Sequence, residues 1–224
     1  MIQTEQRIHR PDGPLAHSPR HDAPPALESG DVMTRAEFER RYWLRPDLKK
    51  AELVEGVVYL SSPTRNPHGT ATVLCIAWLA HYMSLRPDVS VSDAGTVRLS
   101  DDTEVQPDAF LRRVTEAGGQ AHIDEDEFIA GAPELVVEVA YSSASRDLNA
   151  KKRTYQAAGV REYIVWQLEA GAIHWFALVD GAFTAREPDA DGVIESTVFA
   201  GLRLDVGAMV RGDLAGVLEA VAGE

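Results

Sequence analysis

Two carboxylates stand in segments that otherwise have the apolar character of buried strands. Residues 135–140 read LVVEVA, with Glu138 as their polar member, and residues 105–111 read VQPDAFL, with Asp108 directly after a proline. Burying a charge in such a strand costs several kcal/mol unless a cation, a proton or hydrogen bonds compensate it. Each acid therefore predicts a partner that offsets its charge.

A pair of acids followed by lysines is typical of metal-dependent phosphodiester hydrolysis. That reaction needs an activated water, a neutralised phosphate and a stabilised leaving oxygen, and one or two Mg²⁺ ions can serve all three needs. Mg²⁺ prefers one or two carboxylates together with waters and substrate oxygens. We therefore expect Asp108 and Glu138 to bind Mg²⁺, with Mn²⁺ as a substitute. Either Lys151 or Lys152 could then orient the water or stabilise charge on the phosphate.

Each candidate residue also has a purely structural interpretation. Asp108 could end a strand or cap a turn, Glu138 could pair with an arginine, and Lys151 could be an exposed helix lysine. Glu52 could support the metal site through hydrogen bonds, or it could be a strand residue with its own charge partner. His68 could act near the site or cap its helix. The residue types alone leave these alternatives open.

The overall charge is acidic, which bears on possible partners. The 224 residues include 35 acidic and 22 basic side chains, a net charge of −13. Simple non-specific binding to nucleic acid depends on neutralising phosphates, so this charge argues against it. Between Arg146 and Arg161, however, five basic residues stand against one acid. This segment is either a solvated helix face or part of a local basic groove.

Cysteine usage and hydropathy bear on the cellular location. Cys75 is the only cysteine, so a disulfide within the chain is impossible and a reducing cytoplasm is expected. No apolar run approaches the roughly 18 residues that a membrane span needs. The N-terminal residues contain no apolar stretch typical of a secretory signal. We expect a cytoplasmic protein without a membrane partner.

The pattern along the chain predicts one α/β domain behind an N-terminal arm. Residues 1–32 hold five of the twelve prolines and show neither strand nor helix periodicity, which predicts a disordered or loosely packed arm. The domain is expected over residues 33–224. Its expected elements are a helix opening at Thr34, a hairpin over 51–62, a helix over 68–85, strands over 89–92, 96–99, 105–112 and 135–141, a helix over 147–158, a strand over 162–167, antiparallel strands between 173 and 204 and a closing helix over 212–221.

The strand at residues 135–141 is the most apolar and is expected to be central. Because side chains alternate along a strand, Glu138 shares one face with Val136 and Ala140. Glu138 is therefore the polar group on an apolar face. Tyr155 and Tyr163 are expected to be packing residues.

Several short motifs occur in a fixed order along the chain. They are Pro107-Asp108, Glu138-Val139, the spacing Asp147, Lys151, Tyr155, and the run Gly159-Val160 with Glu162-Tyr163, preceded by Glu52-Leu53 with Glu55-Gly56, by Ser62-Pro63 and by His68. This ordered set resembles the Uma-type family of restriction endonucleases, within the PD-(D/E)XK nuclease superfamily. The resemblance covers roughly residues 34 to 185.

The resemblance implies a restriction-endonuclease-like mixed central β-sheet flanked by helices, with a C-terminal antiparallel meander. It implies a Mg²⁺ site at Asp108 and Glu138, with the backbone carbonyl of Val139 as a third ligand. In the superfamily pattern the lysine lies two residues after the acid, but that position here is Ala140. The catalytic lysine would instead be Lys151, from the following helix.

The resemblance also bears on substrate and assembly. It implies hydrolysis of DNA, and a homodimer is expected because restriction-type nucleases often use two active sites to cut two strands. The alternative is a catalytically inactive protein that keeps the nuclease fold as a binding or homodimeric interaction module, since a fold does not fix a function.

Overall fold

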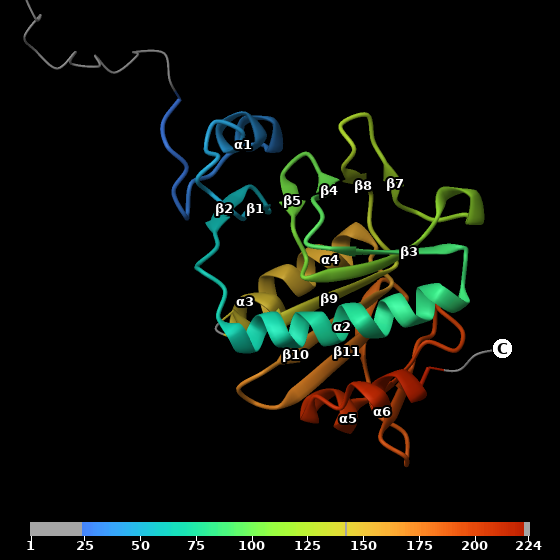
Figure 1. The fold of residues 1–224 in the computed structure, drawn as a ribbon. Coiled ribbons are helices and arrows are strands. Elements are labelled where there is room, and N and C mark those ends of the chain that lie inside the picture. The colour runs from blue at the N-terminus through green and yellow to red at the C-terminus, as the bar shows by residue number, and fades with distance from the viewer. Residues whose placement is uncertain (1–23, 142, 222–224) are drawn as a thin grey trace, which may run out of the picture.

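Two six-stranded β-sheets and the helices around them make up the computed structural model, which describes residues 24–141 and 143–221 (Figure 1). Each sheet combines antiparallel neighbours with a parallel pair. In Figure 1 the first sheet and α1 (Arg35–Tyr42) form the upper part, and the second sheet with its helices forms the lower part. The predicted α/β class, with mixed sheets flanked by helices, is confirmed.

The first sheet carries the predicted hairpin and contributes to one wall of the site. Its strands lie in the order β2, β1, β5, β4, β8, β7. They are β1 (Ala51–Val54), β2 (Val57–Leu60), β4 (Val97–Ser100), β5 (Thr103–Val105), β7 (His122–Ile123) and β8 (Ile129–Ala130). Glu55 and Gly56 form the hairpin turn with φ values of 51° and 78°, the positive values that a two-residue type I′ turn requires. Phe38 of α1 packs with Leu53 and Val58, so α1 covers this hairpin.

The second sheet holds the central strand that carries Glu138. Its strands lie in the order β12, β11, β10, β9, β6, β3. They are β3 (Val89–Asp93), β6 (Ala109–Arg113), β9 (Leu135–Ala140), β10 (Glu162–Gln167), β11 (Ala172–Val179) and β12 (Ala182–Arg186). All six residues of β9 are buried, which confirms that the most apolar segment is an inner strand.

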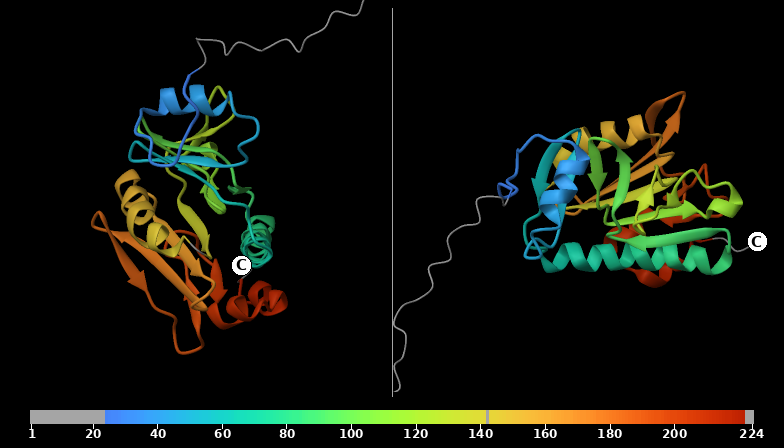
Figure 2. Two further views of the ribbon diagram at one scale, coloured as in Figure 1. Left: turned by 90° about the vertical axis from the view of Figure 1, so that its left-hand side faces the viewer. Right: turned by 90° about the horizontal axis from the view of Figure 1, so that it is seen from above.

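Helices cover both faces of the second sheet (Figure 2). One face packs against α2 (Asn66–Leu85) together with α5 (Val206–Arg211) and α6 (Leu214–Glu219), and the other face packs against α4 (Lys152–Ala158). Trp78 of α2 meets Trp175 of β11 edge to face, with ring centroids 5.8 Å apart. Among the described residues, no helix has both the length and the apolar character to cross a bilayer.

The pleat of β9 places Glu138 on the α4 side of the sheet. Val137 and Val139 belong to the core shared with α2, whereas Val136 and Ala140 belong to the core shared with α4. Because alternate strand residues face the same side, Glu138 points toward α4 and shares its face with Val136 and Ala140, as the sequence predicts.

The prediction of one continuous strand over residues 105–112 is wrong in one respect. The chain leaves the first sheet after β5 and enters the second at β6, so residues 106–108 form a crossover between the sheets. Pro107 lacks an N–H for a strand ladder and disfavours continued pairing. The break places Asp108 at the junction of the two sheets.

The C-terminal half also differs from the predicted elements. The helix expected over 147–158 begins earlier, with α3 (Ala144–Arg146), and continues through a π-helical turn, η2 (Asp147–Lys151), into α4. The closing helix is two short helices, α5 and α6, because Gly212 ends α5 with a φ of 73°. Of the expected meander, β11 and β12 extend the second sheet, while β13 (Val193–Glu195) and β14 (Arg203–Asp205) form a separate antiparallel pair. A short 3₁₀ helix, η1 (Thr115–Ala117), follows β6.

The described end of the predicted N-terminal arm contacts the hairpin. Residues 1–23 of that arm lie outside the described residues. Leu27 is buried in the core that contains Phe38, and the Gly30 N–H donates to the Val58 carbonyl at 2.9 Å. Val32 forms a β-bridge with Val57. The packed part of the chain therefore begins before residue 33.

Candidate active site

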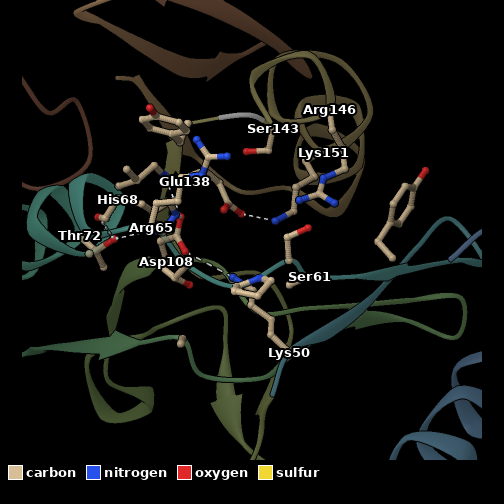
Figure 3. Close-up of a pocket in the computed structure, with 18 of the residues that line it drawn as sticks. Lys50, Ser61, Arg65, His68, Thr72, Asp108, Glu138, Ser143, Arg146 and Lys151 are labelled. Atoms are coloured by element: carbon tan, nitrogen blue, oxygen red, sulfur yellow. Dashed lines mark hydrogen bonds and ion pairs between the residues drawn. The ribbon is translucent and has the colours of Figure 1, made fainter. Parts of the chain in front are cut away.

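A cleft of about 1060 Å³ lies where the hairpin of the first sheet meets the C-terminal end of β9 (Figure 3). One wall is formed by β2, residues 61–65 and the first turns of α2, and the opposite wall by Tyr141 and residues 143–153. Asp108, Glu138 and Lys151 all line this cleft. The structure thus brings together the three residues that the sequence analysis predicts to be catalytic.

Asp108 is held by three groups at the crossover between the sheets. Its Oδ2 accepts a hydrogen bond from the Val139 N–H at 2.9 Å and lies 3.2 Å from Nε2 of His68. Its Oδ1 lies 3.4 Å from Nζ of Lys50. The Val139 N–H is available because β6 pairs with β9 only at residues 135–137. Burial would raise the pKa of Asp108, but His68 and Lys50 outweigh burial and hold the pKa well below its usual value.

His68 lies beside the acid rather than at a helix cap. α2 begins at Asn66, so His68 is inside the first turn. Its Nδ1 lies 3.3 Å from Oγ1 of Thr72 while its Nε2 faces Asp108. The hydrogen bond to Asp108 raises the pKa of His68. His68 therefore orients Asp108 and adds positive charge beside it when protonated.

Glu138 shares one buried ammonium with Glu52. Nζ of Lys151 donates to Oε1 of Glu138 at 2.6 Å and to Oε1 of Glu52 at 2.9 Å. Lys151 is 1% exposed and Glu138 is 3% exposed. The Tyr155 hydroxyl also donates to Oε1 of Glu138, at 2.8 Å, and the Gln106 N–H donates to Glu52 at 2.9 Å. Lys151 is thus the cation that compensates the acid buried in β9.

Sharing one ammonium between two carboxylates separates their pKa values. Burial raises the pKa of Glu138 to about 7, against the effect of Lys151 and with a further contribution from Asp108. Burial acts on Glu52 in the same direction, but Lys151 and Lys50 outweigh it and the pKa of Glu52 lies below its usual value. Burial alone would lower the pKa of Lys151, yet the surrounding acids raise it instead. Lys151 therefore stays charged, and burial holds the pKa of Glu138 above that of Glu52.

A π-helical turn directs Lys151 toward the acids. Lys151 is the last residue of η2, and it lines the cleft together with Arg146, Asn149 and Arg153 of the same helical segment. π-Helical turns are frequent at functional sites because they shift the register of the side chains that follow. Lys152, the alternative candidate, places Nζ 3.6 Å from the ring centroid of Phe176. The structure does not bring Lys152 to the acids.

The cleft is locally basic although the chain is acidic. Its charged lining residues are Lys50, Arg65, Arg146, Lys151 and Arg153 against Asp93, Asp108 and Glu138. In Figure 3 Lys50 lies on the side opposite the helical segment that carries Arg146 and Lys151. Positive charge therefore flanks the two acids on both sides.

The oxygen atoms at the floor of the cleft fit a hard divalent cation. Among the described residues, both hydrogen bonds to the Glu138 side chain fall on Oε1, which leaves Oε2 without a donor. The N–H and C=O of one strand residue point to the same side, so the Val139 carbonyl faces the side where its N–H meets Asp108. Two carboxylates, a carbonyl and waters suit Mg²⁺ or Mn²⁺. Within the described part of the chain, no group of three or more His, Cys, Asp or Glu side chains could hold a metal by itself.

Two members of the site were not identified as such from the sequence. Lys50 stands two residues before Glu52, and alternate residues of an extended chain point to the same side. Tyr155, which was expected only to pack, stands four residues after Lys151, one helical turn along. These spacings, from Lys50 to Glu52 and from Lys151 to Tyr155, could have indicated from the sequence that Lys50 and Tyr155 lie near the predicted site.

The sequence of the chain matches a known protein family. Residues 35–207 match the family model described as "Uma2: Putative restriction endonuclease". The chain belongs to the Uma2 family. The matched range includes all the site residues of this Uma2 protein described above, namely Lys50, Glu52, His68, Asp108, Glu138, Lys151 and Tyr155.

A solved structure shares the fold of this Uma2 protein. It is a crystal structure described as "a putative nuclease belonging to DUF820" from Anabaena variabilis, with a TM-score of 0.62 and 12% sequence identity, covering 77% of this chain and 97% of that chain. At this identity the likeness shows the fold alone. No curated protein matches the chain.

Proposed function

We propose that this Uma2 family protein is a Mg²⁺-dependent endonuclease that hydrolyses DNA phosphodiester bonds in the cleft, with Mn²⁺ as a possible substitute. Asp108, Glu138 and the backbone carbonyl of Val139 hold the metal. Lys151 is the catalytic lysine. The observation that carries the proposal is the meeting of two recessed acids and one buried lysine in a locally basic cleft.

The bound cation would neutralise phosphate charge and promote activation of water. The protein's own groups prepare the site for it. Lys50 and His68 fix the orientation of Asp108, while Tyr155 and Lys151 fix one oxygen of Glu138. Such preorganisation avoids reorganisation during the reaction.

Lys151 has one donor left for the reaction. An ammonium carries three N–H groups, and the described residues accept two of them, on Glu138 and Glu52. The third can donate to the attacking water or to a phosphate oxygen at the floor of the cleft. In this role Glu52 is a positioning residue that holds Lys151 in place.

Nicking of supercoiled plasmid DNA tests the proposal. Wild-type protein with Mg²⁺ or Mn²⁺ should convert the plasmid to the open circle, and Asp108→Asn or Glu138→Gln should lower the rate at least about 100-fold, as for loss of a group that stabilises charge in a transition state. Arg161→Ala is the control, because Arg161 is exposed at the opposite end of β10 and contacts Gln120. Equal nicking by wild type and both acid variants would refute the proposed site.

A non-catalytic binding module is the second candidate, and one observation favours it. Both acids already have cationic partners within the protein, Lys151 for Glu138 and Lys50 with His68 for Asp108. Thermal stability under Mg²⁺ titration separates the two functions. A ligand at 100 times its Kd adds about 2.7 kcal/mol to native stability, so a metal enzyme should melt at a higher temperature and Asp108→Asn should lose the shift. No shift in wild type at saturating Mg²⁺ would favour the binding module.

We also propose assembly as a homodimer, which would bring two clefts together so that each could act on one strand of DNA. Light scattering on the purified protein measures the molar mass. A mass near 49 kDa, twice the 24.5 kDa of one chain, is expected for the dimer.

A further inference from the structure

Two arginine–tyrosine pairs connect the walls of the cleft. The Arg65 guanidinium lies 5.4 Å from the ring centroid of Tyr141, and the Arg146 guanidinium lies 5.3 Å from that of Tyr59. Tyr59 and Arg65 belong to one wall, and Tyr141 and Arg146 belong to the other. Each pair therefore places a guanidinium against a tyrosine ring at the lining of the cleft.

The cleft also holds cations that no protein carboxylate uses. Within the described residues, Arg65 and Arg153 form no ion pair, and both are exposed at the cleft. Other arginines of this acidic chain, such as Arg98, are held by several carboxylates. The charges of Arg65 and Arg153 are therefore free to bind phosphates.

The two acids are recessed in the cleft and expose little surface to a ligand that stays at its rim. Asp108 is 9% exposed and Glu138 is 3% exposed. The cleft volume of about 1060 Å³ is slightly above the range of small-molecule pockets, about 300–1,000 Å³. A short piece of one strand fits such a space, whereas a rigid double helix is far larger.

We propose that the cleft takes a single unpaired nucleic-acid strand, whose bases stack on the Arg65–Tyr141 and Arg146–Tyr59 pairs and whose phosphates bind Arg65 and Arg153. Proteins that bind single strands combine a basic groove with aromatic side chains on which bases stack, and guanidinium planes stack on bases as well. The inference rests on the proposed function for the location of the scissile phosphate. Under this inference the nuclease site acts on unpaired strands, so each cut requires only one active site.

Binding measured without cleavage tests this inference separately from catalysis. The full chain with Asp108→Asn, in the presence of EDTA, is titrated into three fluorescent probes: a 12-nucleotide oligothymidylate, the matching oligouridylate and a 12-base-pair duplex. Asparagine keeps an oxygen that can accept the Val139 N–H. Fluorescence anisotropy should show at least about tenfold tighter binding of one single strand than of the duplex, and the better strand identifies DNA or RNA.

Substitution of the tyrosines tests the stacking contacts. In the Asp108→Asn background, Tyr59→Ala and Tyr141→Ala should each weaken binding of the single strand at least about 5-fold, from the 1–3 kcal/mol that a stacked base contributes. Tyr59→Phe keeps the ring and should retain affinity. Arg153→Ala should flatten the dependence of log Kd on log salt by about one unit or less, and Arg161→Ala should leave it unchanged. Thermal melting confirms that each variant is folded.

Duplex binding as tight as single-strand binding would overturn the inference, as would full affinity in both tyrosine-to-alanine variants. Either result would leave the proposed nuclease reaction standing on duplex DNA. Conversely, a protein that binds single strands through these pairs but never cleaves would support the inference and refute the catalytic proposal.

Discussion

Replacing Lys151 with methionine should destabilise the protein more than most single substitutions. Methionine is similar in length but carries no charge, so Glu138 and Glu52 would lose the ammonium that lies 2.6 and 2.9 Å from them. Lys151 and Glu52 are each 1% exposed, so water can replace the lost partner only in part. Removing one member of a buried ion pair costs about 3–5 kcal/mol. In a domain of this size that corresponds to a melting temperature lower by roughly 6–20 °C.

Urea unfolding followed by circular dichroism measures this loss. Adding Glu52→Gln to Lys151→Met should restore at least about 1 kcal/mol, because one of the two uncompensated acids is then neutral while glutamine still accepts the Gln106 N–H. The double variant distinguishes loss of charge compensation from loss of packing. A Lys151→Met protein within about 1 kcal/mol of wild type, or a double variant with no recovery, would refute the shared-ammonium account.

Three further changes have outcomes that follow from the contacts. Burial raises the pKa of Glu104 from 4.5 to about 8. Between these pH values the folded protein keeps a proton on Glu104 that the unfolded chain releases. The free energy of unfolding therefore falls as the pH rises from about 4.5 to 8. In urea titrations at pH 9, Glu104→Gln should therefore be more stable than wild type, by a few kcal/mol at most. At pH 5 the two proteins should have nearly the same free energy of unfolding. An equal difference between them at both pH values would contradict this. At about pH 9, above the pKa of Glu138 at about 7, Tyr155→Phe removes a donor to an ionised carboxylate and should cost about 1.5–3 kcal/mol. Tyr82→Phe loses a neutral bond to a carbonyl and should cost less, about 0.5–1.5 kcal/mol. The reverse order in urea unfolding at this pH would argue against an ionised Glu138. Gly159 has a φ of 84° and open space around the position that a Cβ would occupy, so Gly159→Ala should cost about 1–2 kcal/mol through backbone strain alone, and an unchanged urea midpoint would show that the turn relaxes.

The sequence predicts the acids because their context is physically unusual. A carboxylate within LVVEVA must be compensated, and the structure provides Lys151, thirteen residues along the chain. The order of motifs predicts the family, and the turn at Glu55-Gly56 predicts the hairpin. These features are local, so they can be inferred from neighbouring residues.

The features that sequence analysis did not resolve depend on contacts between distant segments. The crossover at residues 106–108 is set by which sheet each side of Pro107 joins, and that choice is made by pairing with β1 and β9. The π-helical turn ending at Lys151 contains neither glycine nor proline. Its register coincides with two long-range contacts, Lys151 to Glu52 and the Tyr163 hydroxyl to the Asp147 carbonyl. A periodic helix pattern cannot indicate such a shift.

The central claim is that Asp108 and Glu138 form one metal site at the floor of the cleft. Anomalous diffraction from crystals of the full chain grown with Mn²⁺ measures this most directly. The manganese peak should be coordinated by a carboxylate oxygen of Asp108, Oε2 of Glu138 and the Val139 carbonyl, with Lys151 still bonded to Oε1 of Glu138. Crystals that hold Mn²⁺ elsewhere, or that leave both acids bonded only to their lysine and histidine partners at saturating Mn²⁺, would contradict it.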